Sequence, residues 1–307
     1  MLGRGRSWIR AVGSSIAERF TRRENARYTI GIYEGSSPLD LRPAGVRNPV
    51  LTANDITDVA AKFVADPFMV SDSGVWHMFF EVVTHQREKK IGVATSVDAM
   101  AWQYKQIVLQ ESFDLSYPYV FRSDNAHYMV PEAAKSGSVR LYEASGFPTR
   151  WRFVATLIDE PLVDPSLIEY QGRWWLFAAA GTSDTLFLYF ADKLTGPWTQ
   201  HPMSPVVRHN PHAARSGGRL TIHDGRLLRF AQDDFTSYGY QVHAFHVQTL
   251  TPTAYEEMAV PENPIIKASG LGWNAKKMHT VDPHQVGPHK WIACVDGFGW
   301  SDASRRA

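Results

Sequence analysis

The sequence predicts an all-β fold, a five-bladed β-propeller with a short N-terminal helical extension. Three observations predict it: one motif recurs five times, turns separate short β-prone runs, and 12% of the residues are aromatic. Aromatic and β-branched residues favour strands. A repeat of about 40–50 residues is typical of a four-stranded propeller blade. A β-sandwich with as many strands is the alternative, but the repeat period favours the propeller.

The first 27 residues are rich in arginine and carry apolar side chains at helical spacing. These apolar residues are Trp8, Ile9, Val12, Ile16 and Phe20. The spacing predicts a short amphipathic helix within a basic N-terminal extension, residues 1–27. The segment does not have the apolar core and cleavage site of a secretory signal, so we expect a cytoplasmic protein. Contact between residues 1–27 and a membrane surface is the alternative to an extension that frays or packs.

Five segments begin alike, with a polar or aromatic residue, a proline and a short β-prone run. They open at Asp66-Pro67, Tyr117-Pro118, Asp164-Pro165, Asn210-Pro211 and Asp282-Pro283. Successive openings are 51, 47, 46 and 72 residues apart. Each opening is therefore expected to form the inner strand of one blade. The longer last interval predicts a long loop over residues 261–279.

A turn and a second apolar strand follow each opening, which is the signal of a β-hairpin. The second strands are expected at residues 76–81, 127–132, 174–178, 227–232 and 291–296. Outer strands are expected at 91–96, 139–142, 186–189 and 241–245. The fifth unit has no residues left for outer strands, so residues 28–33 are predicted to complete it and to protect the sheet edges by closing the ring. The propeller is thus expected to span residues 28–301, followed by a tail at 302–307.

Composition excludes several classes of function. The net charge is +1, so the basic surface of a nucleic-acid-binding protein is not expected, and neither is a nucleic-acid partner. Cys294 is the single cysteine, which excludes a disulfide framework and thiolate zinc clusters. The sequence contains none of the short zinc-protease, serine-hydrolase or nucleotide-binding motifs. We expect no cofactor and no metal ligands, with a structural Ca²⁺ in the channel as the alternative.

Carboxylates fall at equivalent positions of the repeats. Aspartate opens three of the five units, Glu81 and Glu132 lie fifteen residues after the first two openings, and Asp296 lies fourteen after the fifth. Because the inner strands of a propeller run beside its central channel, we expect these groups at one mouth of the channel. Clustered carboxylates raise one another's pKa, and glycoside hydrolysis uses such pairs. In the alternative interpretation, each Asp-Pro pair only forms a turn.

The sequence also resembles known families. Residues 65–68, 91–98 and 194–198 are similar to the five-bladed arabinanases, β-xylosidases, levansucrases and invertases. Residues 30–33, 63–69, 116–121, 130–132, 229–233 and 278–282 more closely resemble the N-terminal propeller of plant glucosamine inositolphosphorylceramide transferases and its stand-alone bacterial relatives. The hydrolase resemblance implies a first-blade aspartate as base or nucleophile, a third-blade aspartate that tunes the pKa, and a fourth-blade glutamate as acid. Asp66 and Asp164 match the first two roles. Blade four has no such glutamate, so Glu132 in blade two or Glu81 in blade one would have to substitute for it.

We therefore expect a carbohydrate-active enzyme that acts on a glycosidic bond, a glycosidase or transglycosylase whose partner is a carbohydrate or glycoconjugate. The expected catalytic residues are Asp66, Glu132 and Asp164. The expected substrate-binding residues are Glu81, Tyr117, Trp175, His212, Arg229, Gln232, Asp233, His279 and Asp282. Two alternatives stay open: a non-catalytic propeller that binds a glycan or glycolipid headgroup, and a glycosyltransferase that uses the same pocket.

Overall fold

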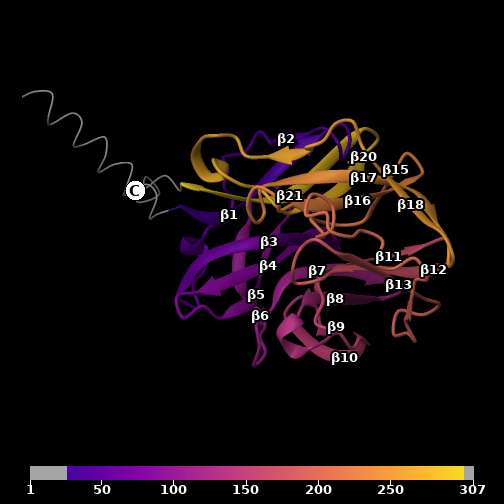
Figure 1. Ribbon diagram of the computed structural model, residues 1–307. Coiled ribbons are helices and arrows are strands. Elements are labelled where there is room, and N and C mark those ends of the chain that lie inside the picture. The colour runs from indigo at the N-terminus through magenta and orange to yellow at the C-terminus, as the bar shows by residue number, and fades with distance from the viewer. Residues whose placement is uncertain (1–25, 301–307) are drawn as a thin grey trace, which may run out of the picture.

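Five antiparallel sheets are arranged as the blades of a propeller, which confirms the predicted fold class (Figure 1). The structure is a computed structural model and describes residues 26–300. The helix predicted around residues 8–20 and the tail at 302–307 lie outside the described residues. Ala26 and Arg27, which the sequence places in the extension, belong to the first strand.

The blades follow one another along the chain. Blade one contains β3 (Ala61–Asp72), β4 (Val75–Thr84), β5 (Lys89–Ser96) and β6 (Gln103–Leu109). Blade two contains β7 (Ser116–Ser123), β8 (Ala126–Glu132), β9 (Val139–Gly146) and β10 (Arg150–Ile158). Blade three contains β11 (Val163–Tyr170), β12 (Arg173–Ala179), β13 (Leu186–Ala191) and β14 (Thr199–Gln200). Blade four contains β15 (Thr221–His223), β16 (Arg226–Asp233), β17 (Gln241–Leu250), β18 (Tyr255–Ala259) and β19 (Ile266–Lys267).

Blade five joins the two ends of the described chain. It contains β20 (Val281–Gly287), β21 (Lys290–Trp300), β1 (Ala26–Gly35) and β2 (Leu41–Pro43). Strand β1 pairs with β21 from Ala26 opposite Trp300 to Gly35 opposite Trp291, so indigo and yellow ribbons lie side by side in Figure 1. The prediction that residues 28–33 close the ring is thereby confirmed. Three short 3₁₀ helices lie in the connections: η1 (Ala53–Asp55), η2 (Ala134–Ser136) and η3 (Gly272–Asn274).

The first three predicted openings share one backbone device. The pairing register of the inner strand shifts at Asp66-Pro67, at Tyr117-Pro118 and at Asp164-Pro165. At each shift the residue before proline has a positive φ, of 51°, 45° and 47° respectively. Non-glycine residues rarely adopt this conformation, and bulges of this kind turn a side chain out of the regular alternation of a strand. The repeat therefore places three lead side chains in equivalent positions.

The fourth and fifth openings differ from this pattern, and the fourth prediction is corrected. Asn210-Pro211 lies in a turn, where the Asn210 side chain accepts a hydrogen bond from the backbone of His212. Asparagine followed by proline is typical of such turns. The inner strand of blade four is instead β15, preceded by a bridge between Ser216 and Ala231. Asp282 lies in β20 as expected, but without a register shift.

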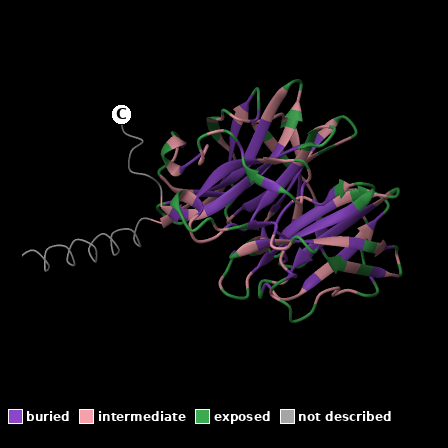
Figure 2. Ribbon diagram, turned by 90° about the horizontal axis from the view of Figure 1, so that it is seen from above, coloured by how far each residue is buried: buried purple, intermediate pink, exposed green. Residues whose placement is uncertain are grey.

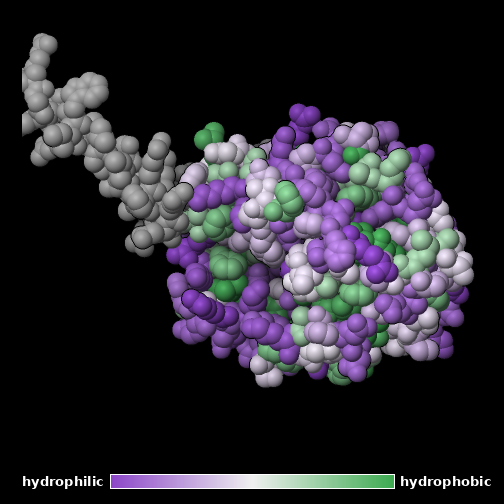
Figure 3. All heavy atoms as spheres, in the orientation of Figure 1, coloured by the Kyte–Doolittle hydropathy of each residue, from purple (hydrophilic) through white to green (hydrophobic). Residues whose placement is uncertain are grey.

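Apolar side chains fill the spaces between neighbouring blades. Four clusters of buried residues pack blade against blade, and Figure 2 shows the buried segments along the strands and the exposed ones in the turns. Hydrophilic and hydrophobic residues are interspersed on the face seen in Figure 3. Within residues 26–300, no helix has the length and apolar character that crossing a bilayer requires.

Candidate functional site

Carboxylates from different blades gather where the inner strands begin and the second strands end. Asp66 and Asp164 occupy the bulges of β3 and β11, and both are buried. Ladder pairing sets Glu81 opposite Ala65, the residue before Asp66, and Glu132 opposite Ser116. Asp296, from β21, is fully buried beside them. The predicted clustering of these acids is therefore present in the structure, and their location at a mouth of the channel stays a prediction.

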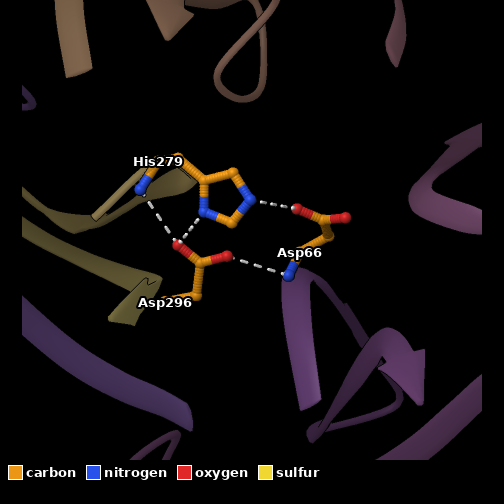
Figure 4. A group of neighbouring side chains, drawn as sticks. All are labelled: Asp66, His279 and Asp296. Atoms are coloured by element: carbon orange, nitrogen blue, oxygen red, sulfur yellow. Dashed lines mark hydrogen bonds and ion pairs between the residues drawn. The ribbon is translucent and has the colours of Figure 1, made fainter. Parts of the chain in front are cut away.

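One half of the cluster is a chain of three side chains from blades one and five (Figure 4). The His279 ring lies between two carboxylates, with Nδ1 2.8 Å from Asp296 Oδ1 and Nε2 3.3 Å from Asp66 Oδ1. The other oxygen of Asp296 accepts the backbone N–H of Asp66 at 3.1 Å. Thr280 donates its hydroxyl to Asp66 Oδ1 at 3.0 Å. Backbone and side chain together fix the orientation of the Asp66 carboxyl group.

This chain of contacts shifts the proton affinity of both ends. Burial raises the pKa of Asp66 to about 7, although the positive charge of His279 acts in the opposite direction. Burial alone would lower the pKa of His279, but the negative charge and hydrogen bond of Asp296 raise it to about 9. Near neutral pH, His279 is therefore an imidazolium, and Asp66 exchanges its proton within the range where enzymes work.

The other half of the cluster pairs two carboxyl groups with a guanidinium. Arg215 donates from Nε to Asp164 Oδ2 at 2.6 Å, and Gln232 donates to the same oxygen at 2.8 Å. The Nη2 atom of Arg215 also lies 3.5 Å from Oε2 of Glu132. Burial raises the pKa of Glu132 to about 8, and the charge of Asp164 and a hydrogen bond to it act in the same direction. Glu132 thus holds a proton at neutral pH beside a carboxylate whose charge Arg215 compensates.

Three further residues, one lysine and two tyrosines, complete the site. The Nζ atom of Lys89 lies 2.7 Å from Oε1 of Glu81, and the Glu81 side chain is buried. The ring of Tyr238, 45% exposed, lies 5.0 Å from the Arg215 guanidinium and 5.5 Å from the His279 ring. The Tyr28 ring lies 4.8 Å from His279. Because buried carboxylates need cations as partners, the sequence indicates that a lysine or arginine lies near the acid cluster. The repeat does not identify which lysine or arginine it is.

Four of the predicted substrate-binding residues are enclosed by protein and bonded to other parts of the fold. Tyr117 is fully buried, and its hydroxyl bonds Ser166 and the backbone of Gly218 across the channel. Arg229 pairs through two hydrogen bonds with Glu257. Trp175 is 2% exposed and belongs to the core between blades three and four. These three expectations are corrected: the side chains are structural because they are enclosed by protein.

Asp282 is the fourth corrected residue. It is fully buried in the channel, where it pairs with Arg219 and lies 3.0 Å from His284 Nε2. Burial alone would raise the pKa of Asp282, but the charges of Arg219 and His284 lower it to about 2. Arg219 also donates to the carbonyls of Met69 and Val120. Asp282 therefore ties inner strands together instead of facing the cluster.

His212 and Asp233 form a separate group beside the cluster on blade four. His212 Nδ1 lies 2.9 Å from Asp233 Oδ1, and Gln241 donates to the other oxygen of Asp233 at 2.9 Å. The His212 ring stacks on exposed Phe235, with 4.6 Å between the ring centroids. The structure does not join these residues to Asp66 or Glu132 by any hydrogen bond between described residues. Their predicted role in substrate binding stays a prediction.

The residues of the trio do not fit the suggested calcium ion. Asp66, His279 and Asp296 offer ligand atoms within 4.8 Å of one another. However, both ring nitrogens of His279 already face carboxylates, and Asp296 accepts the backbone N–H groups of His279 and Thr280. Calcium takes six to eight oxygen ligands, which this closed set of hydrogen bonds does not offer. We derive no chemistry through a metal here.

Comparison with known proteins identifies the family. The family described as "Glucosamine inositolphosphorylceramide transferase 1, N-terminal" matches residues 21–298. The chain belongs to this family. Glucosamine inositolphosphorylceramide transferase 1 of Oryza sativa subsp. japonica is 38% identical over 91% of the chain, and that of Arabidopsis thaliana is 31% identical over 88%. The chain spans only 41% and 39% of the length of these two relatives.

Solved structures with the same fold include glycosidases. An exo-β-1,3-galactanase from Phanerochaete chrysosporium, solved with β-1,3-galactotriose, superposes with a TM-score of 0.60. The match covers 77% of this chain and 59% of the galactanase chain, at 12% sequence identity. At that identity the likeness shows the fold alone. This chain and the galactanase therefore share the propeller fold.

Proposed function

We propose that this propeller acts on a glycosidic bond of a carbohydrate or glycoconjugate, with Glu132 as general acid and Asp66 as general base or nucleophile. The observation that carries the proposal is the pair of unlike carboxyl environments in one cluster. The pKa of Glu132 is raised to about 8, so this residue carries a proton at neutral pH. The pKa of Asp66 is about 7. Pairs of carboxyl groups held in unlike environments are typical of acid and base assignments.

The proposed chemistry follows from these protonation states. Glu132 gives its proton to the glycosidic oxygen as the bond from the anomeric carbon to that oxygen breaks. As general base, Asp66 takes a proton from the water or acceptor hydroxyl whose oxygen forms the new bond to the anomeric carbon. As nucleophile, Asp66 forms a bond to that carbon while the leaving group departs, and water or the acceptor then displaces the Asp66 carboxylate and gives its proton to Glu132. Asp164 does not transfer a proton: its charge, fixed by Arg215 and Gln232, keeps Glu132 protonated. His279, oriented by Asp296, positions Asp66.

The comparisons support a sugar-related role without deciding between hydrolysis and transfer. The galactanase that shares the fold was solved with a trisaccharide. The plant relatives carry the name glucosamine inositolphosphorylceramide transferase 1, and this chain spans about two fifths of their length. A hydroxyl of such a glycolipid could replace water as the acceptor in the same site. We therefore extend the proposal to transglycosylation.

A second candidate is a non-catalytic module that binds a glycolipid headgroup in this site. It is favoured by the hydrogen bonds that already occupy Asp66, since Thr280 and His279 both face Oδ1. The exposed ring of Tyr238 offers a stacking surface for a sugar in either case. A binding module should tolerate the loss of the Glu132 proton, whereas an enzyme should not.

Screening by mass spectrometry separates the two candidates. The wild-type chain is incubated with a panel of oligosaccharides and glycolipids, and shortened or transferred sugars are sought. For any substrate found, Glu132→Gln should reduce turnover at least 100-fold on an unactivated sugar, because general acid catalysis contributes about 10²–10⁴. The loss should be much smaller on an aryl glycoside, whose leaving group does not need the proton. Turnover after Asp66→Ala should be partly restored by azide.

Matched controls come from exposed positions of blades two and three. Glu169→Gln, at an exposed position near the end of β11, and Asp124→Asn, at an exposed position in the turn after β7, make the same chemical changes. Both should leave turnover unchanged. Saturable binding without any product, insensitive to Glu132→Gln, would instead support the binding module. Full turnover in both the Glu132→Gln and Asp66→Asn variants would refute the assignment of these two residues.

A further inference from the structure

The loop that joins β16 to β17, residues 234–240, lies against both halves of the acid cluster. It carries Tyr238, and the centroid of this ring lies 5.0 Å from Cζ of Arg215 and 5.5 Å from the centroid of the His279 ring. Arg215 belongs to one half of the cluster and His279 to the other. A single aromatic ring on a connecting loop therefore spans the two sets of carboxyl groups.

The backbone of the loop also approaches His279 closely. A Cβ atom at Gly239 would lie 2.9 Å from Cβ of His279, and the φ of Gly239 is +64°. Glycine accepts this conformation and this close approach without displacing either segment. The loop is thus in direct contact with the residue that orients Asp66.

The carboxyl groups of the cluster present little surface to a ligand in this conformation. The side chains of Asp66 and Asp164 are 8% and 3% exposed, and that of Glu132 is 21% exposed. A reacting carboxyl oxygen must come within about 3–3.5 Å of the sugar atom on which it acts. A sugar ring is much larger than a water molecule, so it reaches Asp66 only after a covering segment has moved.

The loop is a covering segment that can move without disturbing the core. Of its seven residues only Gly239 is buried, and none belongs to the apolar clusters that the structure describes between residues 26 and 300. The aromatic side chains of Phe235, Tyr238 and Tyr240 are all exposed. Segments with few buried apolar contacts are the ones that open locally while the rest of a protein stays folded.

Two hydrogen bonds hold the tip of the loop in place. Lys277 donates from Nζ to the carbonyl of Tyr238 at 2.8 Å, and the backbone N–H of Gly239 donates to Asp234 Oδ1 at 2.6 Å. The other oxygen of Asp234 is buried and has no hydrogen-bond partner among residues 26–300. A buried acceptor without a partner opposes the closed conformation, because water would bind this oxygen when the loop opens.

We propose that residues 234–240 form a lid that closes the acid cluster in this structure, and that Tyr238 moves outward to admit a sugar and returns over the bound ring. The lid itself is inferred from contacts and burial, whereas its role in admitting a substrate rests on the proposed function. Lys277 fastens the lid, because its hydrogen bond joins the tip of the loop to the segment that carries His279. A closed lid excludes water from the reacting groups.

Chemical labelling of carboxyl groups tests the lid without a substrate. The full chain is treated with a water-soluble carbodiimide and glycine ethyl ester, and mass spectrometry of its peptides gives the rate of modification at each carboxyl group. In wild type, Asp66 and Glu132 should react more slowly than the exposed Glu169. Tyr238→Ala should raise the rates at Asp66 and Glu132 about fivefold or more, because the covering ring is gone, and should leave Glu169 unchanged.

Two further variants separate opening of the lid from loosening of the whole protein. Lys277→Met removes the hydrogen bond to the Tyr238 carbonyl at the protein surface, and it should raise the rate at Asp66 about two- to threefold. Tyr240→Ala makes the same change as Tyr238→Ala at the end of the loop next to β17, and it should leave the rates unchanged. The rate at Asp282, which is fully buried in the channel, should stay at its wild-type value in every variant.

Two results would overturn the lid. One is a wild-type rate at Asp66 and Glu132 in both Tyr238→Ala and Lys277→Met. The other is an increase that Asp282 shares in both variants, because the propeller would then open as a whole. Labelling does not depend on turnover, so failure of the proposed catalysis and failure of the lid are distinguishable.

Discussion

The protonated state of Glu132 can be tested through stability, without knowing the substrate. A carboxyl group whose pKa is raised on folding binds its proton more tightly in the folded than in the unfolded chain. Its contribution to stability is fully present below the unfolded pKa and is lost as pH rises through the folded value. For Glu132 that interval runs from its ordinary value of 4.5 to about 8. At about 1.4 kcal/mol per pH unit the interval corresponds to at most ~5 kcal/mol.

Glu132→Gln resembles the protonated side chain, because its amide still donates to Asp164. The free energy of unfolding of this variant and of wild type, from urea denaturation, should agree within about 1 kcal/mol near pH 4.5. Wild type should then fall below the variant by about 2–5 kcal/mol at pH 9, since part of the effect is screened at the partly exposed carboxyl. Glu169→Gln should run parallel to wild type. Parallel curves for Glu132→Gln would refute the raised pKa and, with it, the general acid.

Three further predictions concern the pH profile, the channel and the core. In a series of rate measurements at different pH, kcat/KM should be highest between about pH 7 and 8. The rate should fall below this range because Asp66 becomes protonated, and above it because Glu132 loses its proton. Arg219→Met should lower the free energy of unfolding by about 3–5 kcal/mol in urea, because it removes the guanidinium partner of the buried Asp282 carboxylate, and adding Asp282→Leu should recover part of it. Trp175→Ala should cost about 3–5 kcal/mol while saccharide affinity stays constant.

The repeat in the sequence predicted the blades because each blade is a local unit of hairpins. A proline after the first residue of the motif marks the bulge in blades one, two and three. The last unit has no residues left for its outer strands, so a strand from the N-terminal side had to complete it. The same motif misled at Asn210, since Asn-Pro also forms a turn by itself. The true inner strand of blade four has no proline. It begins after Gly218, where a Cβ atom would lie 1.9 Å from the Val281 carbonyl oxygen, and close backbone approach leaves only glycine as a signal.

The candidate site was predictable only in part. The acids were found because equivalent positions of a repeat converge in a propeller. Two of their partners, His279 and Gln232, were among the predicted site residues. Lys89 and Arg215 were not, since they are not at repeated positions. The direction in which a side chain points explains why some predicted site residues are structural. Arg229 lies only three residues before Gln232 in the same strand. Arg229 donates to Glu257 on an outer strand, whereas Gln232 donates to Asp164 in the acid cluster. Sequence spacing alone does not distinguish these two environments.

Arg219 joins three inner strands inside the channel. It donates to the carbonyls of Met69 in β3 and Val120 in β7, and it pairs with Asp282 in β20. Asp282 is fully buried, so this ion pair holds blades one, two and five together from within the channel. The acids of the channel therefore have two different tasks, since Asp282 ties strands together while Asp66 and Asp164 belong to the acid cluster.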